Sequence, residues 1–283
     1  MEKMKRQVVI IADMEGASGI FENNSRAFVP GTEEWKAYGR ACITSDVSAV
    51  CAALKECDID DIYVYDEHYA GDSRYNLILE ELPTNIKLFD IPKRRMFWRR
   101  IRGQVKWDLF GIITVGQHAG NGVSDSYFAH TIQTPPIKRL SVNGNGISEI
   151  GLAVYNFYGV KYIANIGCAA SHEEARSINK TVTCITVKDK KKKYEPTYKE
   201  TYKIIKEQVI EAIDNSDSKT PVTIKEPCEI ELDLEPGYEF YFEEEIPIKC
   251  KEEKKKVIWY APEIETGLEF LDYFRSKIKK ANS

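Results

Sequence analysis

Short apolar runs alternate with segments of helical periodicity over the first two thirds of the chain, and this alternation constrains the fold most. Strand-like runs occupy "QVVIIA" (7–12), "IYVY" (62–65), "LFGIITVGQHAG" (109–120) and "KYIANIG" (161–167), while apolar side chains recur at helical spacing within 33–57. Strands that alternate with helices form parallel sheets with helices on both faces. The sequence therefore predicts an α/β protein with a three-layer αβα arrangement and a mostly parallel sheet.

Other segments carry weaker signals of the same kind. An Asn-Gly pair in "SVNGNGIS" is typical of a tight turn after a strand. The further elements expected in this part are a helix at 73–82, a strand at 85–91, a helix from about Ser148 and a short helix at 171–178.

The composition changes at "KDKKKKYEP" (188–196), which we expect to be a solvated linker or a hairpin tip. We therefore predict a metal-binding α/β catalytic domain at 1–188 and a smaller α+β domain, with a role in oligomerisation, at 189–283. The elements expected in the second part are a helix at 197–213, strand-like runs at 221–226 and 228–234, a final strand at 256–261 and a last helix at 263–279.

Charge and cysteine content exclude several classes of protein. The net charge of −4 over 283 residues gives no electrostatic reason to expect nucleic acid or a membrane as partner. The apolar run within 1–12 is too short for a signal peptide, so a cytoplasmic location is expected. The seven cysteines contain no Cys-x-x-Cys, which argues against a disulfide framework and a cysteine zinc site.

Two carboxylates follow the first apolar run, in "IADMEGASG" (11–19). In an extended chain residues i and i+2 face the same side, so Asp13 and Glu15 should converge on one spot. Like charges there repel and raise each other's pKa unless a cation lies between them.

Histidines follow two other predicted strands. His68 ends "DEH" and His118 lies in "GQHAG", while Glu149 lies at the predicted helix start. In open α/β sheets ligands bind beyond the carboxyl ends of the strands. Two histidines and three carboxylates suit one or two Zn²⁺ ions or a similar metal, with Asp13 as the bridging ligand. The alternative is that Asp13 is a lone acid or turn cap and both histidines are merely hydrogen-bonded.

The other two histidines are less clearly placed. His130, in "SYFAHTIQT", could move a proton or stabilise an oxyanion near a metal, or could be an ordinary loop or core residue. His172, beside two glutamates in "SHEEA", is expected to be a capping or surface residue.

At these residues the sequence resembles the zinc D-aminopeptidases of the DppA type, from the dipeptide-transport operon group. The family pattern begins with "DMEG-x-SG", here "DMEGASG", and continues with "D-S-H", "G-x-H", an "SHS"-like histidine and "GE-x-GLNA". The corresponding segments here are "DEH", "GQH", "AHT" and "SEIGLAVYN", in the same order and at similar spacing. The resemblance extends to "WYAPEIETGLEFL" near the end of the chain.

The resemblance implies hydrolysis of short peptides with an N-terminal D-amino acid. It also implies large ring-shaped homo-oligomers, with a decamer among the ring sizes considered. The catalytic histidine would be His130, and two Zn²⁺ ions would be held by Asp13, Glu15, His68, His118 and Glu149.

The chain departs from the family pattern at a few places. "CAASHEEA" (168–175) replaces an acidic "GDD"-like turn, "DEH" replaces "DSH", and Ala129 stands where a serine is usual. The basic segment 93–106 is expected to be a solvated helix or loop, with a docking surface for an acidic partner or a peptide carboxylate as the alternative. These departures concern substrate preference and leave the expected ligands intact.

Two other functions remain open from the sequence. One is a different metal-dependent hydrolase, acting on amides or phosphoesters at the same site. The other is a non-catalytic assembly protein that the metal stabilises.

Overall fold

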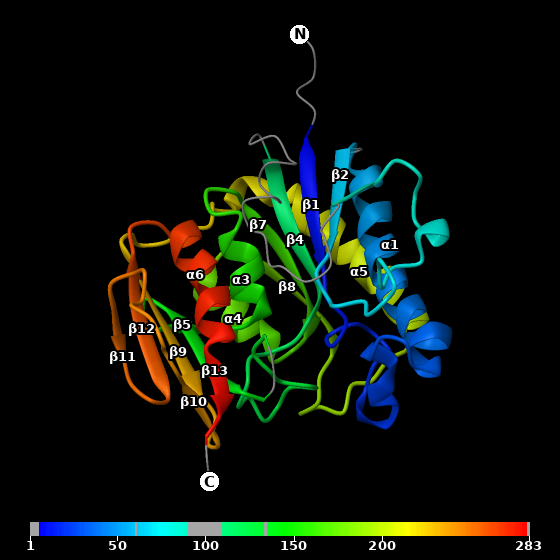
Figure 1. Cartoon of the computed structure of the whole chain (residues 1–283). Helices are drawn as coiled ribbons and strands as arrows, with labels where there is room; N and C mark the ends of the chain where they lie inside the picture. Colours follow the sequence, from blue (N-terminus) through cyan, green and yellow to red (C-terminus); the bar gives the residue numbers. More distant parts are fainter. Residues whose placement is uncertain (1–5, 60, 90–108, 133–134, 282–283) are drawn as a thin grey trace.

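The centre of the molecule is a six-stranded parallel sheet (Figure 1). It belongs to a computed structural model that describes residues 6–59, 61–89, 109–132 and 135–281. The strand order is β3-β2-β1-β4-β7-β8, so the sheet grows in opposite directions from β1 and β4. The strands are β1 (Gln7–Ala12), β2 (Asp61–Asp66), β3 (Lys87–Leu88), β4 (Leu109–Gln117), β7 (Tyr162–Cys168) and β8 (Thr183–Lys188).

Helices cover both faces of this sheet, as the sequence predicts. The long helices α1 (Arg40–Glu56) and α5 (Tyr198–Asp214) pack on one face, and the shorter α3 (Glu149–Tyr155) and α4 (Ser171–Ile178) pack on the other. A π-helical turn (Trp35–Gly39) leads directly into α1. The three-layer αβα arrangement is confirmed.

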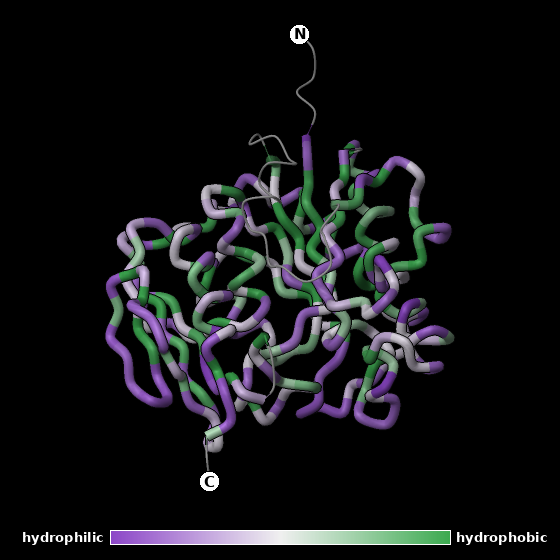
Figure 2. The backbone as a smooth tube through the Cα atoms, in the orientation of Figure 1, coloured by the Kyte–Doolittle hydropathy of each residue, from purple (hydrophilic) through white to green (hydrophobic). Residues whose placement is uncertain are grey.

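Strand β1 shows why the sheet needs both layers. Val8 and Ile10 pack in the core beneath α1 and α5, while Val9 and Ile11 pack in the core on the opposite face. All four side chains are fully buried, because parallel strands between two helical layers have no solvated face. Figure 2 shows the resulting hydrophobic centre with hydrophilic loops around it.

A second sheet of five antiparallel strands lies beyond α3 and α4, in the order β11-β12-β9-β5-β6 (Figure 1). Helix α6 (Ile264–Ser276) packs against β9 and β12. The strands are β5 (Ile137–Val142), β6 (Asn145–Ile147), β9 (Cys228–Leu234), β11 (Cys250–Glu252) and β12 (Lys256–Ala261), beside a small pair of β10 (Tyr238–Phe240) and β13 (Ile278–Lys280). Three short 3-10 helices complete the described elements, at Glu22–Phe28, Leu79–Glu81 and Ser216–Ser218.

The two sheets do not divide along the chain at residue 188. Strands β5 and β6 precede this position but belong to the second sheet, and α5 follows it but packs on α1. Each part of the fold thus contains segments from both sides of residue 188, and the domain boundary between 188 and 189 stays a prediction.

Several expected elements differ in the structure. The predicted helix at 73–82 is wrong, because Asn76 is bound to Asp66 through both its backbone and its side chain, and only Leu79–Glu81 is helical. The run 221–226 has a single bridged residue at Pro221 instead of a strand, and the last helix ends at Ser276. The basic segment 93–106 and part of the strand expected at 85–91 lie outside the described residues.

Within the described ranges, no helix is both long enough and apolar enough to cross a bilayer. All seven cysteines are free, in agreement with the argument against a disulfide framework, and four of them are buried.

Candidate metal and catalytic site

The expected site residues meet where β1 and β4 end. In sheets with this strand order, ligands bind at the point where the order reverses, which here lies between β1 and β4. Asp13 and Glu15 follow β1, and His118 follows β4. The strand ends therefore bring together side chains that are about one hundred residues apart in the sequence.

Two glycines allow these strand ends to approach each other. The Gly16 N–H donates to the Gly116 carbonyl at 2.8 Å. A Cβ atom at Gly16 would lie 1.9 Å from the carbonyl oxygen of Gln117, and one at Gly116 would lie 1.9 Å from that of Asp13. Gly116 also has a φ of +75°, which side chains rarely adopt. Neither position can hold a side chain without separating the two segments.

Asp13 and His118 face each other with one free atom each. Asp13 Oδ1 accepts a hydrogen bond from the Met14 N–H at 2.8 Å, and its Oδ2 lies 3.4 Å from His118 Nε2. His118 Nδ1 lies 2.9 Å from the Ala119 carbonyl and must donate to it, so Nε2 is left as the free ring nitrogen. Both side chains are almost completely buried.

Glu15 is paired with His68, whose Nε2 lies 3.1 Å from Glu15 Oε1. The buried Asn76 holds this histidine in place: its Nδ2 donates to the His68 carbonyl at 2.7 Å and to Asp66 Oδ1 at 2.8 Å. Trp35 Nε1 in turn donates to the Asn76 side chain at 3.0 Å. Asn76 could not be predicted from the sequence, since nothing in the local pattern links it to β2.

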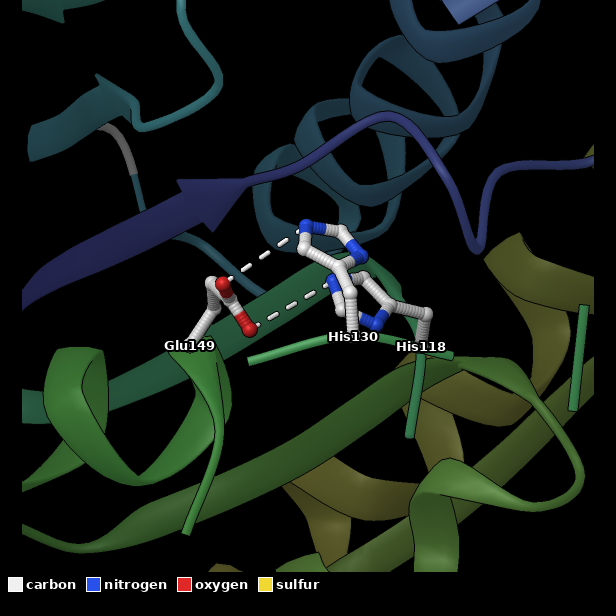
Figure 3. A group of neighbouring side chains, drawn as sticks. All are labelled: His118, His130 and Glu149. Carbon is white, nitrogen blue, oxygen red and sulfur yellow. Dashed lines mark ion pairs between the residues drawn. The ribbon is translucent and has the colours of Figure 1, made fainter. Parts of the chain in front are cut away.

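Glu149 and His130 complete the cluster (Figure 3). The two Glu149 oxygens lie 3.6 Å from His130 Nε2 and 3.6 Å from His118 Nε2, respectively. His130 Nδ1 donates to the Phe128 carbonyl at 2.9 Å, so its Nε2 also points to the carboxylates. All six residues that the sequence singled out as ligands or catalyst are therefore neighbours.

The start of α3, which carries Glu149, is fixed by a residue of the unusual 168–175 segment. Glu174 accepts hydrogen bonds from the backbone N–H groups of Ser148 at 2.6 Å and Gly151 at 3.1 Å. Burial raises the pKa of Glu174 to about 7. The carboxylate thus supports the helix start by satisfying two of its unpaired donors.

His172 is a core residue, and the expectation of a capping or surface role is wrong. It is buried, and its ring nitrogens lie 2.9 Å from Asn165 Nδ2 and 2.9 Å from Thr186 Oγ1. Burial lowers the pKa of His172 to about 4, so the ring is neutral. Two neutral partners explain why a histidine fits there.

The surroundings shift the pKa values of the first two carboxylates, Asp13 and Glu15, in opposite directions. Burial, followed by repulsion from Glu15 and Glu67, raises the pKa of Asp13 well above its ordinary value. Burial would also raise the pKa of Glu15, but the charge and hydrogen bond of His68 outweigh it and hold that pKa well below its ordinary value. Keeping both residues ionised requires additional positive charge, which a divalent cation would supply.

The two stacked histidines are also different from each other. Burial and the neighbouring His130 lower the pKa of His118, which favours a neutral ring with a free Nε2 lone pair. Burial alone would lower the pKa of His130 as well, but the charges of Glu149 and Glu15 outweigh it and raise that pKa. A neutral imidazole suits a metal ligand, and a protonatable one suits a proton carrier.

A fourth carboxylate, Glu67, reaches this cluster and was not predicted as a site residue. Its Oε2 is shielded from solvent and has no hydrogen-bond partner among the described residues. Burial, followed by repulsion from Glu149 and Glu15, raises the pKa of Glu67 well above its ordinary value. Its place between Asp66 and His68 in "DEH", where the family pattern has a serine, was the available signal.

The donor atoms fit a divalent metal. Buried polar atoms without a hydrogen-bond partner are normally rare, yet among the described residues several gather at this one place. Two groups have ligand atoms within 4.8 Å of one another, one made of Asp13, Glu15 and His118 and the other of His118, His130 and Glu149. The unpaired atoms are Asp13 Oδ2, Glu15 Oε2, Glu67 Oε2, His68 Nδ1, His118 Nε2 and Glu149 Oε2. Mixed nitrogen and oxygen donors of this kind are typical zinc ligands.

The cluster opens into a cavity of about 430 Å³. Tyr69 and Tyr75 line it on the β2 side, and Asp272 and Arg275 of α6 line it on the other. A cavity of this size is within the usual range for small-molecule sites. The site is therefore accessible to a small substrate and lies between the strand ends of the parallel sheet and α6.

Lys188 supports the loop that carries Glu15. Although it opens the lysine-rich run expected to be solvated, its side chain is fully buried. Its Nζ donates to the carbonyls of Glu15 at 2.6 Å and Ile20 at 2.5 Å, and lies 5.2 Å from the centre of the Tyr127 ring. Burial lowers its pKa to about 8. The rest of the run forms a turn closed by hydrogen bonds between Asp189 and Tyr194, in agreement with the hairpin alternative.

A doubly wound α/β sheet with a histidine and carboxylate cluster at its switch point defines a protein of the metal-dependent hydrolase type. The sequence profile of the D-aminopeptidase family matches residues 4–273. The chain belongs to this family, which confirms the prediction of a D-aminopeptidase-like enzyme.

The fold agrees with this assignment. The Zn-dependent D-aminopeptidase DppA from Bacillus subtilis, described as a self-compartmentalizing protease, superposes with a TM-score of 0.77. The match covers 96% of this chain and 97% of that chain at 17% sequence identity. No curated protein matches the sequence significantly.

Proposed function

We propose that the chain is a zinc-dependent aminopeptidase that hydrolyses short peptides with an N-terminal D-amino acid, at a site that holds two zinc ions. The observation that carries this proposal is the convergence of unpaired nitrogen and oxygen donors. Those that follow β1 and β2 and the one at the start of α3 line one cavity, and His118, after β4, lies beside them. Family membership and the zinc dependence in the description of the structural relative support it.

The residues that would hold the metals are Asp13, Glu15, His68, His118 and Glu149. Bound zinc supplies a Lewis acid for the scissile carbonyl and lowers the pKa of a water. The protein's own part is to orient these donors. Backbone carbonyls and Asn76 fix the histidines, and Lys188 and Glu174 fix the segments that carry Glu15 and Glu149.

His130 has the proton-transfer role in this proposal. Its Nδ1–H is held by the Phe128 carbonyl, and its Nε2 faces the cavity beside Glu149. A proton held at Nε2 can pass to the leaving amine or stabilise the developing oxyanion. The ring is less buried than that of His118, so it can reach a bound peptide.

We also propose that copies of the chain assemble into a ring, for example a decamer. The structural relative is described as self-compartmentalizing. Light scattering on the purified protein would give the number of copies, and a monomer at micromolar concentration would contradict this part.

The test of the reaction is a substrate panel on zinc-loaded protein. D-alanyl and L-alanyl dipeptides and p-nitrophenyl phosphate would be compared, with His118→Ala as the control that loses a ligand. We expect D-peptide hydrolysis that His118→Ala abolishes. Hydrolysis of the phosphoester alone, or full peptidase activity in His118→Ala, would contradict the proposal.

A further inference from the structure

Glu67 is held by its backbone at the edge of the histidine and carboxylate cluster. It follows β2, and its N–H donates to the Ala12 carbonyl at the end of β1 at 2.8 Å. Its side chain lines the same cavity as Asp13, Glu15 and Glu149. The carboxylate is therefore built into the site by the pairing of two central strands.

The position of Glu67 separates it from the ligand clusters. It belongs to neither of the two groups whose ligand atoms lie within 4.8 Å of one another. Its Oε2 is shielded from solvent without a hydrogen-bond partner among the described residues. Shielding a carboxylate oxygen from water costs free energy unless a cation or a hydrogen-bond donor contacts it. A positively charged group bound in the cavity would supply such a contact.

We propose that Glu67 binds the N-terminal ammonium group of the peptide substrate. This inference rests on the proposed function, since a substrate of an aminopeptidase carries a free ammonium beside the scissile bond. An ammonium donates up to three hydrogen bonds, and a charge-assisted bond to a carboxylate is about twice as strong as a neutral one. Glu67 would thus select peptides with a free amine.

The test uses zinc-loaded full-length protein with Glu67→Gln and Glu67→Ser, the second being the residue of the family pattern. Glu80→Gln, on the exposed surface, is the matched control. Zinc per chain, kcat and KM for a D-alanyl dipeptide, and calorimetric binding of D-alaninol are measured. D-alaninol carries the ammonium but no scissile bond, so its binding is read independently of catalysis.

We expect both Glu67 variants to keep their zinc, to raise KM and the D-alaninol dissociation constant by about 10- to 100-fold, and to change kcat little. Loss of zinc would show that Glu67 is a metal ligand and would overturn the inference. Lower kcat at unchanged KM, or unchanged D-alaninol binding, would also overturn it. If the wild type binds zinc but cleaves no peptide, and both Glu67 variants bind D-alaninol more weakly than the wild type, the proposed reaction fails while the role of Glu67 in binding amines stands.

Discussion

The imidazole rings of His118 and His130 stack with their centroids 4.2 Å apart and 9° between their planes. One ring follows β4 and the other lies in the loop beyond it, yet each donates its Nδ1–H to a nearby backbone carbonyl. Both therefore turn Nε2 toward the same carboxylate, Glu149. The stack places a buried ring and a more accessible ring at one candidate metal site.

Substitutions at these two histidines should separate zinc binding from catalysis. We expect His130→Gln to keep its zinc and to lower kcat by about 10²- to 10⁴-fold, the usual contribution of general acid–base catalysis. His118→Gln should lose zinc as well as activity. Metal analysis beside steady-state kinetics makes the comparison, and zinc loss in His130→Gln would instead identify this residue as a ligand.

Asn76 should be important for both stability and metal binding. Asn76→Ala removes hydrogen bonds to Asp66, the His68 carbonyl and Trp35 in a buried place. At about 1 kcal/mol for each bond, with an added cost for unpaired groups, the free energy of unfolding should fall by about 2–4 kcal/mol. Urea denaturation measures this, with the exposed Asn145→Ala as control. Equal midpoints for the two variants would show that the Asn76 network contributes little.

The approach of β1 and β4 can be tested at Gly116. Gly116→Ala places a Cβ in contact with the Asp13 carbonyl, whereas Gly144→Ala, also at positive φ, meets no atom within 4 Å. Backbone strain of about 1–2 kcal/mol is common to both variants. Overpacking should lower the free energy of unfolding of Gly116→Ala by about 1–3 kcal/mol more. The same variant should also bind zinc more weakly. Similar melting temperatures and similar zinc binding for the two would refute the close approach.

Lys188 predicts an unusual dependence of stability on pH. Its pKa is about 8 in the folded chain against an ordinary value of 10.5, so in this interval the unfolded chain binds more protons. The free energy of unfolding should rise across the interval by about 3 kcal/mol relative to Lys188→Met. Denaturation at a series of pH values tests this, with the exposed Lys191→Met expected to follow the wild type. A wild-type curve parallel to that of Lys188→Met would contradict it.

Local patterns in the sequence predict the strands whose packing follows the periodicity of their apolar residues. The strands at 7–12, 228–234 and 256–261 have the predicted bounds, because their apolar residues alternate or run unbroken as a buried strand requires. The ligands at the strand ends could be predicted because the parallel topology determines where strand ends meet.

Tertiary contacts decided what the sequence could not predict. The expected helix at 73–82 is replaced by the attachment of Asn76 to Asp66, a contact between segments ten residues apart. Lys188 looks like part of a solvated run until its partners, the carbonyls of Glu15 and Ile20, are known. Glu67 could not be singled out because the cavity that it shares with Glu15 and Glu149 exists only in the folded chain.

The central claim is that Asp13 and Glu15 end a buried strand because metal ions lie between them and the histidines. Its most direct test is the metal content of the purified protein by plasma mass spectrometry, beside Asp13→Asn and the exposed control Asp125→Asn. We predict about two zinc ions per chain in the wild type and the control, and most of them lost in Asp13→Asn. Absence of bound metal in the wild type after addition of zinc at neutral pH would contradict the account.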